Sequence, residues 1–540
     1  MKLIKPTLLI TTIIPSALAE WQYLSRPDLS PPRLNITVPA TSVSPGYIFI
    51  TPYSGFEDGS SGPDQPGAYI FRDDGDLIWS GLGYLGGAVA NFGPAEIDNK
   101  PVLKAAQGLL DGSHGRGYAN HAILDDHYET VKVLRAASHQ VASIHEFQVI
   151  GGKTVLIETP VPVPFDLSSY GGDEDQRWIL SSGFQEIDIQ TGELLFEWYS
   201  LDHITPKHSA LPLTPTGPFN GDTSKNAWDY FHLNSADKDR DGNYLISARN
   251  YAAIFKINGT TGEVIWQLGG PQGSDFEIPP ETEFAFQHDA RIQYRSDDDE
   301  GLIERISFFD NADHSQPGHS LDSISRARYI ELNHTSKTAR SIQTFSPPDP
   351  LIANSQGNTQ FLPSGNVFVN WGQAGAITEF SEKGDVLFHA YLDSYPNSHV
   401  QSYRGFRFPW TGYSGEEPAV VALGGLTGLV SIYVSWNGDT ETASWEFYLV
   451  EGGAGGGRRY LGTKPRTSFE TSFHAHLDSS AVGNRNQVFV AAEARDANGR
   501  VLGRSRVASL ADREPYTSLQ LVSQGWSELR SEYDQQRLEL

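Results

Sequence analysis

The sequence predicts an all-β protein: a six-bladed β-propeller followed by an immunoglobulin- or fibronectin-like β-sandwich. Three observations support this prediction. Short apolar segments alternate with glycine-containing turns, and similar phrases return about every 40 to 60 residues, which is typical of propeller blades. The chain of 540 residues also contains 53 glycines and 23 tyrosines, as suits a protein built of strands and turns.

Two hairpin phrases define the expected blades. The outer phrase is a glycine and an acidic residue before an apolar strand that ends in an aromatic residue, and the inner phrase is Gly-Asn before an apolar strand. The outer phrase occurs at 75–79, 192–196, 262–266 and 384–388, and the inner phrase at 241–246 and 364–369. Counting divergent copies, we expect about six units in a propeller that spans residues 45–412.

A second domain is expected over residues 418–510. Its strands alternate apolar and polar residues, and Asn437-Gly438 is a strong hairpin signal. This pattern favours the β-sandwich, whose usual role would be to pack beside the propeller. Residues 20–44 form a proline-rich extension before the propeller, and residues 511–540 form a polar tail.

The N-terminus resembles a secretory signal peptide. Two lysines precede an apolar run and a group of small residues, so we exclude residues 1–19 from the fold. Sequons at Asn35, Asn258 and Asn333 are consistent with glycosylation in a eukaryotic secretory pathway. No later apolar run approaches the roughly 20 residues that span a bilayer. We therefore expect a secreted or luminal protein without a membrane partner.

The charge of the chain excludes one class of partner. The formal net charge is −26, and no cluster of lysine and arginine stands out, so nucleic acid would be repelled. The chain has no cysteine, and its stability must therefore come from burial rather than from disulfides.

Two histidines mark the stretch that organises the candidate site. His232 and His288 each follow aromatic residues and precede a nearby Asn or Asp, which could fix the tautomer of the imidazole. Either histidine alone could equally be a hydrogen-bonded structural residue. In a propeller, however, inner strands surround one axial channel, so polar residues of different blades can share a pocket.

Neutral histidine and cationic arginine in such a pocket would hold an oxyanion or polarise a phenolate oxygen, while aromatic side chains would hold an apolar body. The candidate catalytic residues are His232, His288 and either Arg326 or Arg328. The expected substrate-binding residues are His145, Trp228, Tyr230, Asn234, Phe286, Asp289, Asn358, Trp371 and Arg404. The expected partner is an aromatic or phenolic small molecule.

We expect neither a metal nor a cofactor. Asp237, Asp239 and Asp241 imitate the start of an EF-hand calcium loop, but Ala248 occupies the twelfth position, where a bidentate glutamate is needed. The chain has no His-Glu-x-x-His spacing for zinc and no Gly-x-Ser-x-Gly elbow for a serine nucleophile.

The chain resembles the fungal branch of the arylsulfotransferase family over residues 45–412. The phrases that carry the resemblance include Ser-Ile-His-Glu-Phe at 143–147, Trp-Asp-Tyr-Phe-His-Leu-Asn-Ser at 228–235, Phe-Gln-His-Asp-Ala-Arg at 286–291 and Gly-Asn-Thr-Gln at 357–360. The resemblance implies a six-bladed propeller with an appended sandwich domain.

In the bacterial arylsulfate sulfotransferases, a histidine takes the sulfuryl group from an aryl sulfate and passes it to a phenol, without a nucleotide donor. The resemblance implies that His232, His288 and Arg328 hold the sulfate. It also implies a nucleophilic histidine in the blade that runs through residues 355–358, yet no histidine occurs between His334 and His389. Loss of that covalent acceptor would stop ping-pong transfer.

Three functional hypotheses follow. Fungal proteins with this domain also resemble hetero-Diels–Alderases, which join a phenol- or tropolone-derived quinone methide to an alkene or terpene. The first hypothesis is therefore a non-covalent cyclase of secondary metabolism, with His232 and His288 as donors and Arg328 as anion clamp. The second is aryl sulfotransfer through a sulfurylated histidine. The third is a non-catalytic secreted propeller that binds glycans or proteins, for which a channel without convergent histidine and arginine would be the sign.

Overall fold

The computed structural model of the chain describes residues 21–56, 62–298, 301–314, 320–392, 400–424, 428–452, 455–477 and 488–511. The all-β prediction is confirmed. Helical structure in the described residues is limited to short 3-10 turns: η1 (Ser168–Tyr170), η2 (Ser200–Asp202), η3 (Pro206–His208), η4 (Pro280–Thr282) and η5 (Gly372–Ala374). The expected signal peptide over 1–19 and residues 512–540 of the tail lie outside the described residues.

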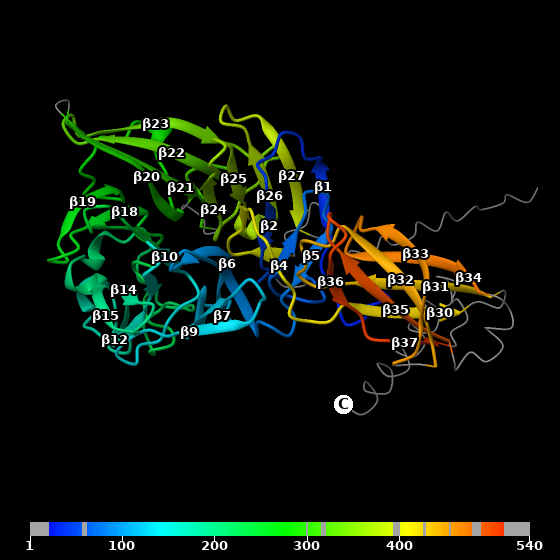
Figure 1. Ribbon diagram of the computed structural model, residues 1–540. Helices are drawn as coiled ribbons and strands as arrows, with labels where there is room; N and C mark the ends of the chain where they lie inside the picture. The colour runs from blue at the N-terminus through cyan, green and yellow to red at the C-terminus, as the bar shows by residue number, and fades with distance from the viewer. Residues whose placement is uncertain are drawn as a thin grey trace, which may run out of the picture.

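The expected six blades are confirmed, and they succeed one another along the colour gradient of Figure 1. Blade 1 contains β29 (Phe406–Phe408), β2 (Tyr47–Ile50), β4 (Tyr69–Phe71) and β5 (Leu77–Ser80). Blade 2 contains β6 (Ala88–Ile97), β7 (Lys100–Asp111), β8 (Arg116–Leu124) and β9 (Thr130–Leu134). Blade 3 contains β10 (Phe147–Ile150), β11 (Thr154–Glu158), β14 (Gly183–Asp188) and β15 (Leu194–Tyr199).

The remaining blades follow the same antiparallel order. Blade 4 contains β16 (Leu233–Lys238), β17 (Tyr244–Ala248), β18 (Ala253–Ile257) and β19 (Val264–Gly269). Blade 5 contains β20 (His288–Asp298), β21 (Gly301–Asp310), β22 (Arg326–Asn333) and β23 (Thr338–Phe345). Blade 6 contains β24 (Asn358–Phe361), β25 (Val367–Asn370), β26 (Ala376–Phe380), β27 (Val386–Leu392) and β1 (Leu34–Val38). Two short pairs lie between blades: β3 (Pro52–Ser54) with β28 (Val400–Ser402), and β12 (Val161–Pro164) with β13 (Trp178–Ser181).

The ring is closed by strands from both ends of the propeller sequence. In blade 1, β29 pairs with β2, so that Phe406 lies opposite Phe49. In blade 6, β1 pairs with β27, so that Leu34 lies opposite Leu392. Residues 34–38, which the sequence assigned to an extension, therefore supply the outer strand of a blade. Pairing of distant segments in this way removes free sheet edges at the closure.

The expected β-sandwich is present as a nearly closed β-sheet domain, drawn mainly in orange in Figure 1. Its strands are β30 (Ala419–Gly424), β31 (Leu429–Ser435), β32 (Ser444–Glu451), β33 (Arg458–Pro465), β34 (Glu470–His476), β35 (Val488–Arg495), β36 (Val501–Arg504) and β37 (Ala508–Ala511). Strand β37 joins the two halves, because it pairs with β30 on one side and with β35 on the other. Apolar side chains of both halves, including Ile432 and Phe447, share one core.

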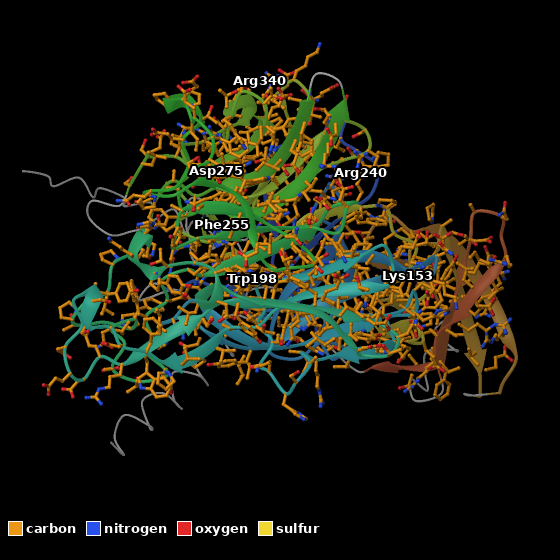
Figure 2. All side chains as sticks on the ribbon, turned by 90° about the vertical axis from the view of Figure 1, so that its left-hand side faces the viewer. Lys153, Trp198, Arg240, Phe255, Asp275 and Arg340 are labelled. Carbon is orange, nitrogen blue, oxygen red and sulfur yellow. The ribbon has the colours of Figure 1, made fainter. Side chains whose placement is uncertain are left out.

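The blades pack on one another through apolar side chains. Every residue of β17 and β18 is buried, because these middle strands have neighbouring blades on both faces. Figure 2 shows the side chains on the ribbon and labels Trp198 and Phe255, which are 2% and 0% exposed, and Arg240 and Arg340, whose side chains are 64% and 63% exposed.

Asn437-Gly438, predicted from the sequence to be a hairpin turn, instead lies between β31 and β32, which do not pair with each other, and it contacts the propeller. The Asn437 side chain accepts a hydrogen bond from Ser80 N and donates one to Ser80 O. Gly438 has a positive φ of 90°, and a Cβ there would lie 2.4 Å from the Tyr128 ring. Glycine is therefore required at this contact with blades 1 and 2.

Candidate active site

The centre of the propeller contains four paired charges that we call the ion-pair layer: Glu146, Asp289 and Arg404, which are buried, and Arg291, whose side chain is 13% exposed. Arg404 Nη1 donates to Glu146 Oε1 at 3.0 Å, and Arg404 Nε lies 3.2 Å from Asp289 Oδ1. Arg291 Nη2 lies 2.9 Å from Glu146 Oε2 and 2.6 Å from Asp289 Oδ1. Burial alone would raise the pKa of Glu146, but Arg291 and Arg404 outweigh burial and lower this pKa to about 2.

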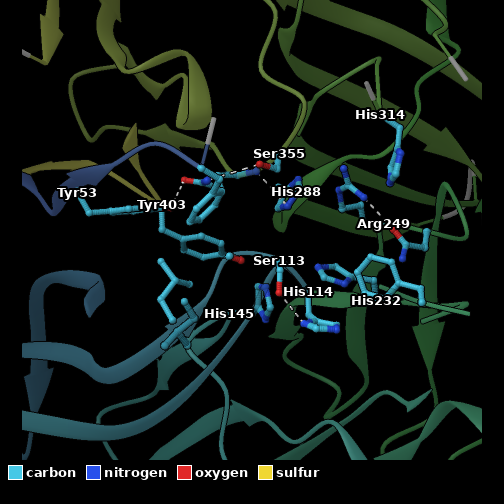
Figure 3. Close-up of a pocket in the computed structure, with 18 residues that line it drawn as sticks. Tyr53, Ser113, His114, His145, His232, Arg249, His288, His314, Ser355 and Tyr403 are labelled. Atoms are coloured by element: carbon cyan, nitrogen blue, oxygen red, sulfur yellow. Dashed lines mark hydrogen bonds between the residues drawn. The ribbon is translucent and has the colours of Figure 1, made fainter. Parts of the chain in front are cut away.

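A cavity of about 200 Å³ adjoins this layer, and we call it the histidine pocket (Figure 3). It lies next to the layer because His145, His288 and Tyr403 line it, and each is the chain neighbour of a layer residue. The lining residues are Tyr53, Phe56, Leu110, Gly112, Ser113, His114, Gly115, Ile144, His145, Phe219, His232, Arg249, Asn250, His288, His314, Ser355, Gln356 and Tyr403.

His232 is held by a buried carboxylate. Its Nδ1 lies 2.7 Å from Asp229 Oδ2, so the ring donates its proton there and Nε2 carries a lone pair. Nothing in the described residues hydrogen-bonds to this Nε2. Burial lowers the pKa of His232 despite the opposing effect of Asp229. The residue also has a positive φ of 53°, a left-handed conformation that costs energy and often marks functional sites.

His145 has a second arrangement of the same kind. Its Nδ1 lies 2.8 Å from Glu158 Oε2 and 2.8 Å from Ser143 Oγ. Its ring centroid is 4.9 Å from that of His232, with the planes at 75°. As for His232, no described residue hydrogen-bonds to Nε2. Two imidazoles with carboxylate partners thus lie side by side at one cavity.

Two further histidines of the pocket, His288 and His114, have both ring nitrogens engaged. His288 Nδ1 lies 2.7 Å from Asn311 Oδ1, and its Nε2 accepts the Gln356 N–H at 3.2 Å. Burial lowers the pKa of His288 well below its ordinary value. His114 Nδ1 and Nε2 lie 2.9 Å from Asp111 Oδ2 and 3.0 Å from Asn226 Oδ1. Neither His288 nor His114 offers a free nitrogen.

Arg249 brings a buried positive charge to the pocket. Its Nη1 donates to Asn250 Oδ1 at 2.9 Å, and its Nη2 donates to Asn354 O at 2.6 Å. Among the described residues, no carboxylate oxygen lies within 4 Å of this guanidinium. Burial lowers the pKa of Arg249 to about 10, which leaves the group cationic at neutral pH. A cation with neutral partners and further N–H donors can bind an anion.

Tyr403 is the second polar group of the pocket without a full set of partners. Its ring lies 5.5 Å from that of His145, and its buried hydroxyl has no hydrogen-bond partner among the described residues. Burial raises the pKa of Tyr403, so the hydroxyl keeps its proton.

The sequence profile of the arylsulfotransferase (ASST) family matches residues 93–392, which is more than half of the chain. The chain belongs to the arylsulfotransferase family. A search of curated proteins gave no match.

Similar solved structures have low sequence identity. A protein of unknown function from Bacteroides caccae is 12% identical, with 68% of this chain and 100% of that chain covered and a TM-score of 0.35. A mutant of the GH43 protein BlXynB from Bacillus licheniformis is 10% identical, with 78% and 90% covered and a TM-score of 0.29. A levansucrase mutant from B. megaterium is 10% identical, with 62% and 90% covered and a TM-score of 0.30.

In this arylsulfotransferase-family propeller, three of the residues selected from the sequence line the histidine pocket: His145, His232 and His288. Arg328 does not line it. This arginine is paired with Asp310 at 3.5 Å in blade 5 and donates to Glu281 O at 2.7 Å. The arginine that lines the pocket is Arg249.

The other selected residues have structural partners and do not line the histidine pocket. Asp289 and Arg404 belong to the ion-pair layer, and Asn234 donates to Gln287 O beside it. Asn358 exchanges hydrogen bonds with the backbone of Gly405. The buried aromatic residues Trp228, Tyr230 and Trp371 direct their polar atoms to Leu211 O, Ile204 O and Thr378 Oγ1. The ring centroid of Phe286 lies 5.7 Å from the Arg249 guanidinium.

The sequence reasoning missed Arg249, Tyr403, His114 and Gln356. Two of these had a local signal: Arg249 directly follows the buried strand β17, and Tyr403 directly precedes Arg404. Packing between blades decides which arginine reaches the pocket, and a local sequence pattern does not predict that packing.

The acidic loop that imitates a calcium site is occupied by cations of the chain itself. Asp239 Oδ2 lies 2.7 Å from Lys256 Nζ, and Asp241 pairs with Arg295. Within the described residues, one group of ligand-type side chains is close enough to hold an ion, namely Asp125, Asp126 and His127, far from the pocket lining and partly exposed.

The sequons and the cellular location stay predictions. Asn35 is exposed on β1, whereas Asn258 Oδ1 and Asn333 Oδ1 accept backbone N–H groups of their own turns. Within the described part of the chain, no helix has the length and apolarity that crossing a bilayer requires.

Proposed function

We propose that this protein transfers sulfuryl groups from aryl sulfates to phenols in the histidine pocket, with His232 as the covalent acceptor. The observation that carries the proposal is the Asp229–His232 pair, whose open Nε2 lies in the same cavity as the buried cation Arg249. A neutral imidazole nitrogen with a lone pair is a nucleophile, and a carboxylate behind it stabilises the charge that forms on attack.

The charges around His232 match those of a sulfurylated histidine. Attack by Nε2 on sulfur would leave a positive ring next to Asp229 and a negative sulfuryl group next to Arg249. Arg249 is close enough to His232 to lower its pKa. His288 is a poorer acceptor because its Nε2 is occupied and its Nδ1 partner is a neutral amide. His232 thus takes the role that the family resemblance assigned to the segment 355–358.

The size of the pocket favours this reaction over the non-covalent cyclase. Sites for drug-sized ligands usually enclose about 300 to 1,000 Å³. A cavity of about 200 Å³ suits one aromatic ring at a time, as transfer in two half-reactions requires. The cyclase would have to enclose a quinone methide and an alkene together. The apolar side chains Leu110, Ile144 and Phe219 line the cavity and suit a single ring.

The binding-module hypothesis is disfavoured by the same pocket. It predicted a channel without convergent histidine and arginine, whereas His145 of blade 3, His232 and Arg249 of blade 4 and His288 of blade 5 all line one cavity. A phenolic partner and a secretory location remain part of the proposal.

The proposal is tested with the purified mature protein, p-nitrophenyl sulfate as donor and phenol as acceptor. We expect p-nitrophenolate release that depends on phenol, formation of phenyl sulfate, and no release in the His232→Gln variant. The matched control is His127→Ala, because this histidine is exposed and outside the pocket. Absence of release from any single-ring aryl sulfate by the wild-type protein would refute the function. Formation of a cycloadduct from a quinone methide and an alkene would then support the cyclase.

A further inference from the structure

We propose that His145 is the catalytic acid and base for the aryl oxygen, with Glu158 as its positioning residue. This inference rests on the proposed function and assigns the second imidazole of the pocket. It starts from the observation that two histidines at one cavity have the same open Nε2 but different surroundings.

The two histidines lie side by side but have different neighbours. Arg249 acts on His232 and His288, and it provides the positive charge that a sulfuryl group needs. His145 instead lies beside Tyr403, and its chain neighbour Ile144 contributes an apolar wall. A sulfate near Arg249 and a ring against the apolar wall would place the bridging oxygen between His232 and His145.

The carboxylate of Glu158 fits His145 for proton transfer. Because Nδ1–H is donated to Glu158 Oε2 at 2.8 Å, the proton of the reaction can be exchanged only at Nε2, which is open to the cavity. The carboxylate also stabilises the imidazolium that forms when Nε2 takes a proton. The 4.9 Å separation of the two rings leaves both Nε2 atoms within reach of one substrate.

The proton and the sulfuryl group then balance over one cycle. His145 enters the cycle with a proton on Nε2 as well as on Nδ1. In the first half-reaction, the lone pair of His232 Nε2 attacks sulfur, the S–O bond to the aryl group breaks, and the leaving oxygen takes the proton from His145 Nε2, which leaves His145 neutral. In the second half-reaction, His145 Nε2 removes the proton of the acceptor phenol. The phenolate oxygen attacks sulfur, and the N–S bond breaks with its electron pair returning to His232.

The experiment compares His145→Gln with wild type on two donors. Phenyl sulfate releases a basic phenolate that needs a proton, whereas p-nitrophenyl sulfate releases a stable anion that does not. We expect the variant to lose about 10²- to 10⁴-fold in kcat/KM with phenyl sulfate, and much less with p-nitrophenyl sulfate. Glu158→Gln should also lower kcat/KM more with phenyl sulfate than with p-nitrophenyl sulfate. His127→Ala should leave the ratio of these two kcat/KM values unchanged.

A second measurement separates the two histidines. With p-nitrophenyl sulfate and no acceptor, we expect His145→Gln to release about one equivalent of p-nitrophenolate and to carry a sulfuryl group on the His232 peptide after a neutral quench. Equal loss with both donors in a variant that melts like wild type would overturn the role of His145 and leave the transferase function intact. A sulfuryl group on the His145 peptide in the wild-type protein would also overturn it.

Discussion

The ion-pair layer and the histidine pocket are neighbouring buried polar regions that differ in how completely their groups are paired. In the layer, each of the two carboxylates lies within 3.2 Å of a nitrogen atom of both arginines. In the pocket, Arg249 has only neutral oxygen partners, and the hydroxyl of Tyr403 has none among the described residues.

This difference separates structure from function within the channel. Buried polar groups are normally hydrogen-bonded, and a buried ion that loses its partner is costly. A set of paired charges such as the layer can hold blades together, because each ion has a counter-ion within reach. The pocket keeps open positions on both imidazoles, which is what a bound reactant needs. Proximity to the axis alone does not distinguish the two regions.

The largest expected effect is on transfer, at the pocket. Replacing His232 by Gln removes the covalent acceptor while keeping a polar side chain of similar size. We expect the rate of transfer from p-nitrophenyl sulfate to phenol to fall at least about 10⁴-fold, the scale on which nucleophile and base knockouts act. Thermal unfolding should change little, because the glutamine amide can donate to Asp229 in place of Nδ1 and Nε2 has no partner to lose. A residual rate within tenfold of wild type would contradict the assignment.

The next effect is on stability, in the layer. Glu146→Ala leaves the buried Arg404 and the part-buried Arg291 with one carboxylate fewer, and we expect a loss of about 3 to 5 kcal/mol in the free energy of unfolding. Denaturant unfolding of both proteins measures it. Glu96→Ala, at an exposed position of the neighbouring strand β6, is the control and should stay within about 0.5 kcal/mol of wild type. If Glu146→Ala and Glu96→Ala lower the free energy of unfolding by the same small amount, the ion-pair layer does not stabilise the packing of the blades.

The sequence predicted the fold well because its signals are local. Glycine turns and apolar strands recur along the chain, so that phrases such as 262–266 and 384–388 indicate the blade without knowledge of its neighbours. The strand pairing that closes the ring of blades was harder to predict from the sequence. Strand β1 is a five-residue segment whose partner is β27, and nothing near Leu34 records that distant pairing.

The site was predicted in part, because some of its residues carry a local sequence signal and others are placed only by packing between distant segments. His145, His232 and His288 lie at strand starts, and the ring of blades brings such positions together. Which arginine joins them depends on side-chain packing: Arg328 turns toward Asp310, whereas Arg249 turns toward the cavity. Pairing partners from other blades decide whether a polar group is structural or available, and a single sequence does not contain that information.

The choice between the two arginines can be tested directly. Arg249→Lys keeps the charge but loses the planar donor set, and we expect about a 10²- to 10³-fold loss in kcat/KM for aryl sulfates. Arg328→Lys should leave kcat/KM within a few-fold, since this arginine contacts Asp310 and Glu281 O and not the pocket. Steady-state kinetics of both variants decide the matter, and the reverse ranking would restore Arg328 as the anion clamp.

The pH dependence gives a smaller, graded effect. Burial lowers the pKa of His232 below its ordinary 6.5, so the nucleophile stays neutral as the pH falls to that value and is protonated only below it. We expect kcat/KM for p-nitrophenyl sulfate to fall tenfold per pH unit on the acid side of the lowered pKa. An acid limb centred above 6.5 would contradict this, because it would require a raised pKa.

The smallest effect compares two buried tyrosine hydroxyls. Tyr128 OH donates to Gly438 O at 2.7 Å and accepts from Trp410 Nε1 at 3.1 Å, whereas Tyr403 OH has no partner among the described residues. Removing a paired hydroxyl costs about 1 kcal/mol or more, but removing an unpaired one relieves a desolvation penalty. We therefore expect Tyr128→Phe to lower the free energy of unfolding by about 1 to 3 kcal/mol, and Tyr403→Phe to leave it unchanged or raise it slightly. If Tyr403→Phe destabilises the protein as much as Tyr128→Phe does, its hydroxyl is a structural group, and the distinction between a paired layer and an open pocket fails at this residue.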